Sequence, residues 1–211
     1  KSSYATELLS SDDPKIINDR SISLITLNNK RKDIETSILN DIDFDKIEKI
    51  NKNVIIYYSP YINEGLIGII AARLKDYFNK PCVVITTSNG VLKGSARSIY
   101  KYNIGRAIKI ALDRDIIIGG GGHEMAAGFT LKEKNLENFK EFLLKNFLQC
   151  GASNKHIFNY DAEISSIAFN KNFFDDIKKM QPFGTGNPLP IFFFKDLKII
   201  KTTILEKKHI L

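Results

Sequence analysis

The stretch VIIYYSPYINEGLIGIIAARLKDYFNKPCVVITTSNGVLKGSA, residues 54–96, decides the fold that this sequence predicts. It begins at residues 54–58 with an uninterrupted apolar run of the kind found in buried strands. A loop containing proline, asparagine and glycine then leads into a helical pattern at 66–78, and two further strands are predicted at 82–86 and 91–96. Strands that alternate with a helix in this way are typical of a compact α/β domain.

The same alternation continues further along the chain. We expect a helix at residues 103–112, a short strand at 116–118, a glycine-rich loop at 119–122, a strand at 127–131 and an amphipathic helix at 133–148. The strands of this α/β domain are expected to form one mixed sheet.

Different patterns flank this region on both sides. Upstream, Asp12-Asp13-Pro14 supplies acidic capping residues and a proline at a helix start, and apolar residues recur at helical spacing as far as Ile42. Downstream, the residues GASN at 151–154 are the best candidate for a boundary, and short strands, a helix and a turn follow them. We therefore expect a long connecting helix at residues 1–45, an α/β domain at 46–150 and a truncated β-rich domain at 155–211.

The composition indicates which kind of binding partner and which cellular compartment to expect. The chain has 31 Lys and Arg against 24 Asp and Glu, a net charge of +7 that mildly favours an anionic partner. Cys82 and Cys150 lie far apart without a CxxC pair, which is typical of thiols in a reducing compartment. Because no apolar run could cross a membrane and no secretory signal is present, we expect a cytoplasmic protein. The chain lacks an initial methionine and stops within an apolar stretch, so we expect a piece of a longer protein.

The run GGGGH at residues 119–123 is the strongest functional signal in the sequence. Consecutive glycines cost backbone entropy, so the position needs something that only glycine provides. The bare backbone of Gly120, Gly121 and Gly122 can approach an anion closely and point N–H groups at it, and His123 can add a donor or a charge. The alternative is a flexible turn with a solvated histidine. Four glycines followed by further small residues favour the anion site.

Two shorter motifs contain further candidates for binding an anion. Ser95 and Arg97 alternate along a predicted strand, so both side chains emerge on one face and suit a phosphate. An exposed strand end explains this pair about equally well. The loop that contains Asn63 runs into a helix N-terminus, where unpaired N–H groups attract anions. Tight helix packing is the more natural explanation for Gly65 and Gly68 in that motif.

The remaining motifs in the sequence do not indicate a catalytic centre. The turn PFGTGNP at residues 182–188 is rigid and, on chemistry alone, structural. We find no Asp and His cluster at metal-ligand spacing and no nucleophile with a partnered base. We therefore expect no metal to be bound by this chain, and any metals used in hydrolysis to be held elsewhere.

Together these motifs resemble the RecJ family of single-stranded-DNA exonucleases within the DHH phosphoesterase superfamily. Four stretches match in the same order: the connecting helix with Asn29 and Arg31, EGLIGI at 64–69 followed by Arg73-Leu74, GSARS at 94–98, and GGGH at 120–123 followed by Ala126-Ala127-Gly128. The turn at 182–190 resembles the start of the family's oligonucleotide-binding (OB) fold. This turn narrows the resemblance from the superfamily to RecJ.

The resemblance implies a division of labour between this chain and an absent N-terminal DHH domain. That domain would hold Mn²⁺ or Mg²⁺, and a metal-activated water would attack the phosphodiester. In this chain, the run from Gly120 to His123 would bind the phosphate near the scissile bond, with His123 in a catalytic role. Ser95 and Arg97 would hold the terminal 5′ phosphate, and the OB part would guide the strand. The chain alone would not cleave.

The implied parent protein is a monomeric 5′-to-3′ exonuclease of DNA repair and recombination. Its expected partners are single-stranded DNA and a single-strand-binding protein or helicase. One departure stands out, because Ile62-Asn63 replaces the Trp-His that is common in the family. Asn63 can donate a hydrogen bond to phosphate but cannot be protonated.

Two other functions stay open at the level of the sequence. One is a phosphodiesterase of the same superfamily that acts on short oligonucleotides or cyclic dinucleotides. The other is a non-catalytic nucleic-acid-binding module like the C-terminal domain of alanyl-tRNA synthetase. The turn at 182–188 argues against the first alternative. The motif GSAR at 94–97 together with an OB-like extension argues against the second.

Overall fold

The computed structural model describes residues 3–50, 53–151, 159–198, 200, 204–205 and 209–210. The chain divides into two compact units, Lys1–Lys155 and His156–Leu211. Residues 152–158, which include most of the expected boundary at 151–154, lie outside the described residues.

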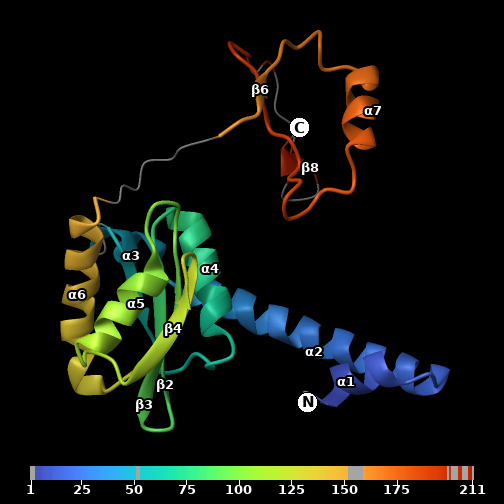
Figure 1. Ribbon diagram of the computed structural model, residues 1–211. Helices are drawn as coiled ribbons and strands as arrows, with labels where there is room; N and C mark the ends of the chain where they lie inside the picture. Colours follow the sequence, from blue (N-terminus) through green and yellow to red (C-terminus); the bar gives the residue numbers. More distant parts are fainter. Residues whose placement is uncertain are drawn as a thin grey trace. The chain divides into compact units, whose positions relative to one another are not determined.

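Three helices open the first unit (Figure 1): α1 at Ser3–Ser10, α2 at Pro14–Asp41 and α3 at Phe44–Ile50. The expected helix start is confirmed, because the Asp13 side chain caps α2 by accepting a hydrogen bond from the N–H of Lys15 at 2.8 Å. Arg20 of α2 pairs with Glu7 of α1, so the two helices pack against each other.

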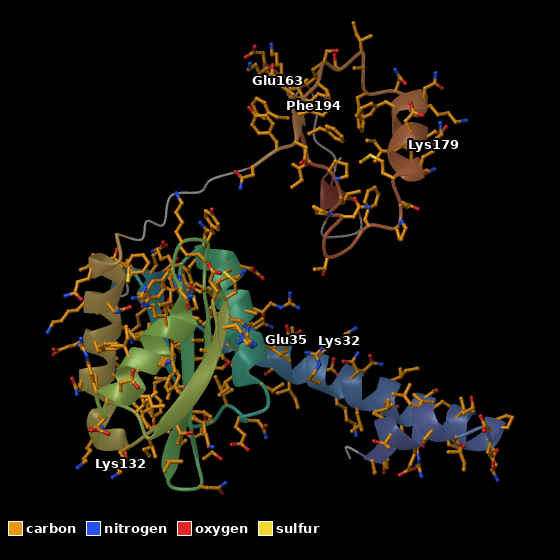
Figure 2. The ribbon with its side chains drawn as sticks, viewed as in Figure 1. Lys32, Glu35, Lys132, Glu163, Lys179 and Phe194 are labelled. Carbon is orange, nitrogen blue, oxygen red and sulfur yellow. The ribbon has the colours of Figure 1, made fainter. Side chains whose placement is uncertain are left out.

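A buried ion network fastens α2 to the rest of the unit. Glu35 of α2 is only 5% exposed, and its carboxylate accepts hydrogen bonds from Arg31 and Arg73, each at 2.7 Å. Arg73 belongs to helix α4, so the network joins two elements that are distant in the sequence. Figure 2 shows Glu35 on α2 where that helix meets α4.

A five-stranded mixed sheet forms the centre of the unit, as the sequence predicts. Its strands stand in the order β1-β2-β3-β5-β4, with β1 and β2 parallel and the other neighbours antiparallel. Their bounds are Ile55–Tyr58 for β1, Cys82–Ser88 for β2, Val91–Arg97 for β3, Gly119–His123 for β4 and Ala126–Leu131 for β5.

Helices cover the two faces of this sheet unequally. On one face α4 (Ile67–Phe78) packs over β2 and β3, while α5 (Ile104–Asp113) and α6 (Leu136–Gln149, after the short helix η1 at Glu133–Asn135) pack on the other (Figure 1). Each face therefore has its own apolar core. Strands β4 and β5 contact α5 on one side, whereas α4 covers mainly β2 and β3 on the other. The α4 face is thus open over β4 and β5.

Two local expectations were wrong. Residues 116–118 form a bend rather than a strand, with Ile116 and Ile117 buried in the core under α5 and α6. The glycine run is not a loop but strand β4, paired with β5 along its whole length. A strand was predicted at 116–118 because a short apolar run resembles a buried strand. The strand at 119–123 was missed because glycine is depleted in strands. The glycine run nevertheless forms a strand, because it pairs with β5 and because the packing around Phe129 leaves no room for a side chain at Gly120.

The second unit is small and contains short elements. Strands β6 (Ala162–Glu163) and β7 (Phe192–Phe193) pair in parallel, β8 (Ile204–Leu205) and β9 (His209–Ile210) pair antiparallel, and α7 spans Lys171–Lys179. The turn at 182–188 is closed by two backbone hydrogen bonds between Gly184 and Asn187. The Asn187 side chain also donates to the carbonyls of Met180 and Pro182, at 2.9 and 3.0 Å. The expected rigid turn is therefore present.

Candidate phosphate-binding site

The four glycines of β4 divide into two kinds when a side chain is imagined at each. At Gly120 a Cβ would lie 2.8 Å from Cβ of Phe129 and 3.0 Å from Ile108, and at Gly122 it would overlap the carbonyl oxygen of Ala126. Packing inside the protein therefore demands glycine at these two positions. Phe129 and Ile108, which crowd Gly120, both belong to the core under α5 and α6.

Nothing inside the protein demands glycine at Gly119, Gly121 or Gly128. A Cβ at Gly119 or Gly121 would meet no atom within 4 Å, and at Gly128 only the carbonyl oxygen of Gly94 at 3.8 Å. None of the three has a positive φ. Glycine in a strand interior costs roughly 0.5–1 kcal/mol relative to alanine, and it often marks the close approach of a ligand. These three positions leave bare backbone on the open face of the sheet.

The strand register places the predicted site residues on that open face. Residues directly opposite one another on neighbouring strands project to the same side of a sheet. The register therefore sets two adjacent rows across β3, β5 and β4: Ser95–Gly128–Gly121 and Arg97–Ala126–His123. Ser95 and Arg97 share one face, as predicted, and the register brings His123 and Gly121 to the same face.

Arg97 and Ser95 form a preassembled pair beside α4. The Arg97 guanidinium donates to Ser95 Oγ at 3.2 Å and to the Ala96 carbonyl at 2.9 Å. Above them, a Cβ at Gly68 would lie 3.1 Å from Arg97 and 3.2 Å from Ser95, so this glycine lets α4 approach the pair closely. Within the described ranges no carboxylate pairs with Arg97. Its positive charge is therefore available to an anion.

Asn63 shapes the start of α4. Its side-chain oxygen accepts from the N–H of Gly65 at 2.9 Å, and its carbonyl accepts from Leu66 at 2.8 Å. The hydroxyl of buried Thr86 holds the same loop by donating to the Ile62 carbonyl at 2.6 Å. Asn63 is exposed, and its amide N–H₂ group remains able to donate to a ligand. Helix α4 has no side-chain cap, which leaves N–H groups of its first turn available as well.

His123 ends β4 and is exposed. Its backbone is fixed, because a Cβ on Gly105 of α5 would lie only 2.6 Å from the His123 carbonyl oxygen. No hydrogen bond or ion pair of the imidazole is found among the residues that the structure describes, so the side chain is accessible to a ligand.

A hollow of about 510 Å³ adjoins these residues on the open face. Residues at the start of α4, among them Glu64 and Gly65, line it together with residues of the sheet that include Lys93, Gly128 and Thr130. Lys93 and Thr130 were not predicted as site residues, although Lys93 continues the period-two pattern of Ser95 and Arg97. The described part of the chain contains no group of three or more His, Cys, Asp or Glu that could hold a metal ion.

Comparison with known domain families assigns both units. Residues 51–149 match the DHHA1 domain and residues 160–211 match the RecJ OB domain. The chain carries a DHHA1 domain followed by a RecJ OB domain. The resemblance to RecJ that the motifs predicted is therefore confirmed. The DHHA1 domain contains the sheet with its open glycine face, and the RecJ OB domain contains the rigid turn.

Bacterial relatives are similar in sequence to most of this chain. The single-stranded-DNA-specific exonuclease RecJ of Haemophilus influenzae is 29% identical over 90% of this chain and 35% of its own length. RecJ of Bacillus subtilis is 28% identical over 88% of this chain and 24% of its own length. The chain thus spans about a third or less of the length of these curated relatives.

Solved structures show the same fold. RecJ from Thermus thermophilus in complex with Mn²⁺ superposes with a TM-score of 0.74 and 23% identity, covering 91% of this chain and 28% of that one. Its complex with Mg²⁺ gives a TM-score of 0.71, also with 23% identity, over 90% of this chain and 29% of that one. The expected fold class, a connecting helix, a mixed α/β domain and an OB-type domain, is confirmed. None of the helices in the described ranges is long and apolar enough to cross a membrane.

Proposed function

We propose that this chain is the substrate-binding part of a metal-dependent 5′-to-3′ single-stranded-DNA exonuclease. The observation that carries the proposal is the pairing of Arg97 and Ser95 beside glycine backbone that nothing inside the protein requires. The relatives named as single-stranded-DNA-specific exonucleases support the choice of substrate. The match of residues 160–211 to the RecJ OB domain favours it over a phosphodiesterase for short oligonucleotides.

In this proposal the terminal 5′ phosphate sits against Ser95 and Arg97. The planar guanidinium offers two parallel N–H groups to two phosphate oxygens, and the Ser95 hydroxyl adds a third donor. The uncapped first turn of α4 and the Asn63 amide reinforce the positive field at the same place. A free 5′ end is required because the helix closes over one side of the pair.

The next phosphate lies across the sheet, at β4. The backbone of Gly120, Gly121 and Gly122 allows a close approach, and His123 donates a hydrogen bond to this phosphate or to the leaving oxygen. His123 is thus the residue of this chain nearest to the chemistry.

The metal and the attacking water belong to another part of the parent protein. A bound Mn²⁺ or Mg²⁺ would activate the water and stabilise charge on the reacting phosphate. The solved RecJ structures with each ion support this assignment, and the described residues of this chain offer no fitting ligand group. The chain alone therefore binds strands without cutting them.

The proposal extends to the cellular role. The connecting segment at 1–45, in which α2 is the long helix, joins the absent catalytic domain to the α/β domain at 46–150. The OB part at 155–211 guides the strand by stacking and backbone contacts. The parent protein works as a cytoplasmic monomer in DNA repair and recombination. There a single-strand-binding protein or a helicase supplies its single-stranded DNA.

The proposal is tested by the affinity of the 211-residue chain for 5′-phosphorylated and 5′-hydroxyl single strands. Wild type should prefer the phosphorylated strand, and Arg97→Ala should lose that preference. The log–log salt slope of binding should fall by roughly 0.7, the value for one phosphate contact on a single strand. Lys49→Ala removes one exposed charge from α3 and should leave the preference intact. Equal discrimination by Arg97→Ala and wild type contradicts the proposed 5′-phosphate role.

A further inference from the structure

The hollow beside Ser95 and Arg97 is lined by groups of different chemistry. Gly119, Gly120 and Gly128 contribute backbone from β4 and β5, so part of the surface is bare and flat. Glu64 and Lys93 contribute a carboxylate and an ammonium group from different elements. Its volume of about 510 Å³ is within the range of sites that bind small molecules.

Lys93 lies on the same face of the sheet as Ser95, in the neighbouring row. It lies on β3 two residues before Ser95, and the register continues its row through Thr130 to Gly119. Two residues along a strand span about 6.8 Å, so the Lys93 row is about that far from the row of Ser95. A group covalently attached to a phosphate at Ser95 can therefore reach Lys93, and it would lie over Gly128 in doing so.

The charges in the hollow are not used inside the protein. Neither Lys93 nor Glu64 takes part in an ion pair or a side-chain hydrogen bond with any residue that the structure describes. Lys93 is partly exposed and lines the hollow. With the Thr130 hydroxyl, the hollow offers donors and acceptors together. A pure anion site would not present a free carboxylate.

We propose that this hollow receives the terminal nucleoside of the strand whose 5′ phosphate is held by Ser95 and Arg97. The inference rests on the proposed function and deepens it. The sugar and one face of the base lie on the bare backbone at Gly128 and Gly119, and Lys93 donates to an acceptor on the base edge. Every base carries such an acceptor, so the hollow selects for the presence of a base and not for one sequence. Lys93 is therefore a substrate-contacting residue that specifies an intact terminal nucleotide.

The test compares two 5′-phosphorylated single strands that differ only at the first position, which holds a natural nucleoside in one and an abasic sugar in the other. The wild-type 211-residue chain should bind the natural strand about tenfold more tightly, the effect of one hydrogen bond to a charged group. Lys93→Ala should reduce that preference to within about twofold while still preferring a 5′ phosphate over a 5′ hydroxyl. Lys49→Ala, with the same loss of charge on α3, should behave like wild type.

The outcomes separate this inference from the function on which it rests. Equal affinity of wild type for the natural and the abasic strand overturns the nucleoside site, and so does a full preference in Lys93→Ala. In both cases an intact preference for the 5′ phosphate leaves the phosphate site standing. Loss of 5′-phosphate preference in wild type itself would instead overturn the proposed function.

Discussion

Gly120 and Gly121 are neighbours in β4, but they are glycine for different reasons. At Gly120 a side chain would collide with Phe129 and Ile108, whereas at Gly121 it would meet no atom within 4 Å. The first residue serves the packing of the sheet against α5. The second leaves backbone open to a molecule outside the protein, which is where the proposed strand lies.

Replacing each of these glycines by alanine should therefore give opposite results. Gly120→Ala should destabilise the fold by about 1–3 kcal/mol, because the core has no room for a methyl group. Gly121→Ala should leave stability unchanged or raise it by up to about 1 kcal/mol, and should weaken binding of single strands. Chemical denaturation and strand-binding titrations measure both effects. A Gly121→Ala protein that binds like wild type would mean that no ligand approaches this backbone.

For single residues, the sequence predicts which face of a strand a side chain occupies better than it predicts which residues pack against it. Ser95 and Arg97 were placed on one side correctly, because alternation in a strand is a local property. The split within the glycine run was not predictable, since it depends on Phe129 from a neighbouring strand. Lys93 continues the same alternation, but it was not predicted as a site residue because lysine is frequent in this chain and its charge alone does not mark a binding site.

Among the elements, α2 and α4 are joined by the most heavily buried charge in the unit. Glu35 accepts from Arg31 on its own helix and from Arg73 on α4. The hydrogen bond from Arg73 is the largest influence on Glu35 and lowers the pKa of its carboxyl group, against the opposing effect of burial. Because α4 also packs close to Ser95 and Arg97, this network joins α2 to the proposed phosphate site.

Glu35→Gln should destabilise the protein by about 2 kcal/mol, because a neutral amide cannot replace two charge-assisted hydrogen bonds. Since the folded-state pKa is lowered, the carboxylate stabilises the fold above the ordinary glutamate pKa of 4.5 and loses this effect as the pH falls below it. The gap between wild type and Glu35→Gln should thus narrow in acid. Glu48→Gln, which neutralises an exposed carboxylate 3.3 Å from Lys80, is the matched control and should cost little. A gap that widens in acid would refute this role.

The elements themselves were largely predictable where caps and periodicity are strong. Asp13 and Pro14 mark the start of α2, and the apolar period of α4 gives its extent within a residue or so. The strand β4 was missed because tertiary pairing overrides the low strand propensity of glycine. The ion network between α2 and α4 joins residues 38 positions apart, and no local pattern reveals it.

For the whole molecule, the DHHA1 and RecJ OB domains present two different surfaces for the proposed contacts with a single strand. The first presents the Arg97–Ser95 pair and bare glycine backbone, which suit a phosphate at the end of a strand. The second is a small unit with clustered aromatic rings, including the stacked pair Tyr160 and Phe193 at 5.1 Å between ring centroids. In the proposal, a strand end is recognised by the first domain and its continuation by the second.

The central claim is that a strand's 5′ phosphate meets the open face of the sheet at Arg97, Ser95 and the free glycines. Its most direct test is the shift of backbone amide NMR signals when the isotope-labelled chain is titrated with a 5′-phosphorylated single strand. We predict large shifts at Ser95, Arg97, Gly121 and Gly128, which shrink when the strand carries a 5′ hydroxyl. Shifts confined to residues 160–198, or identical for both strands, would contradict the claim.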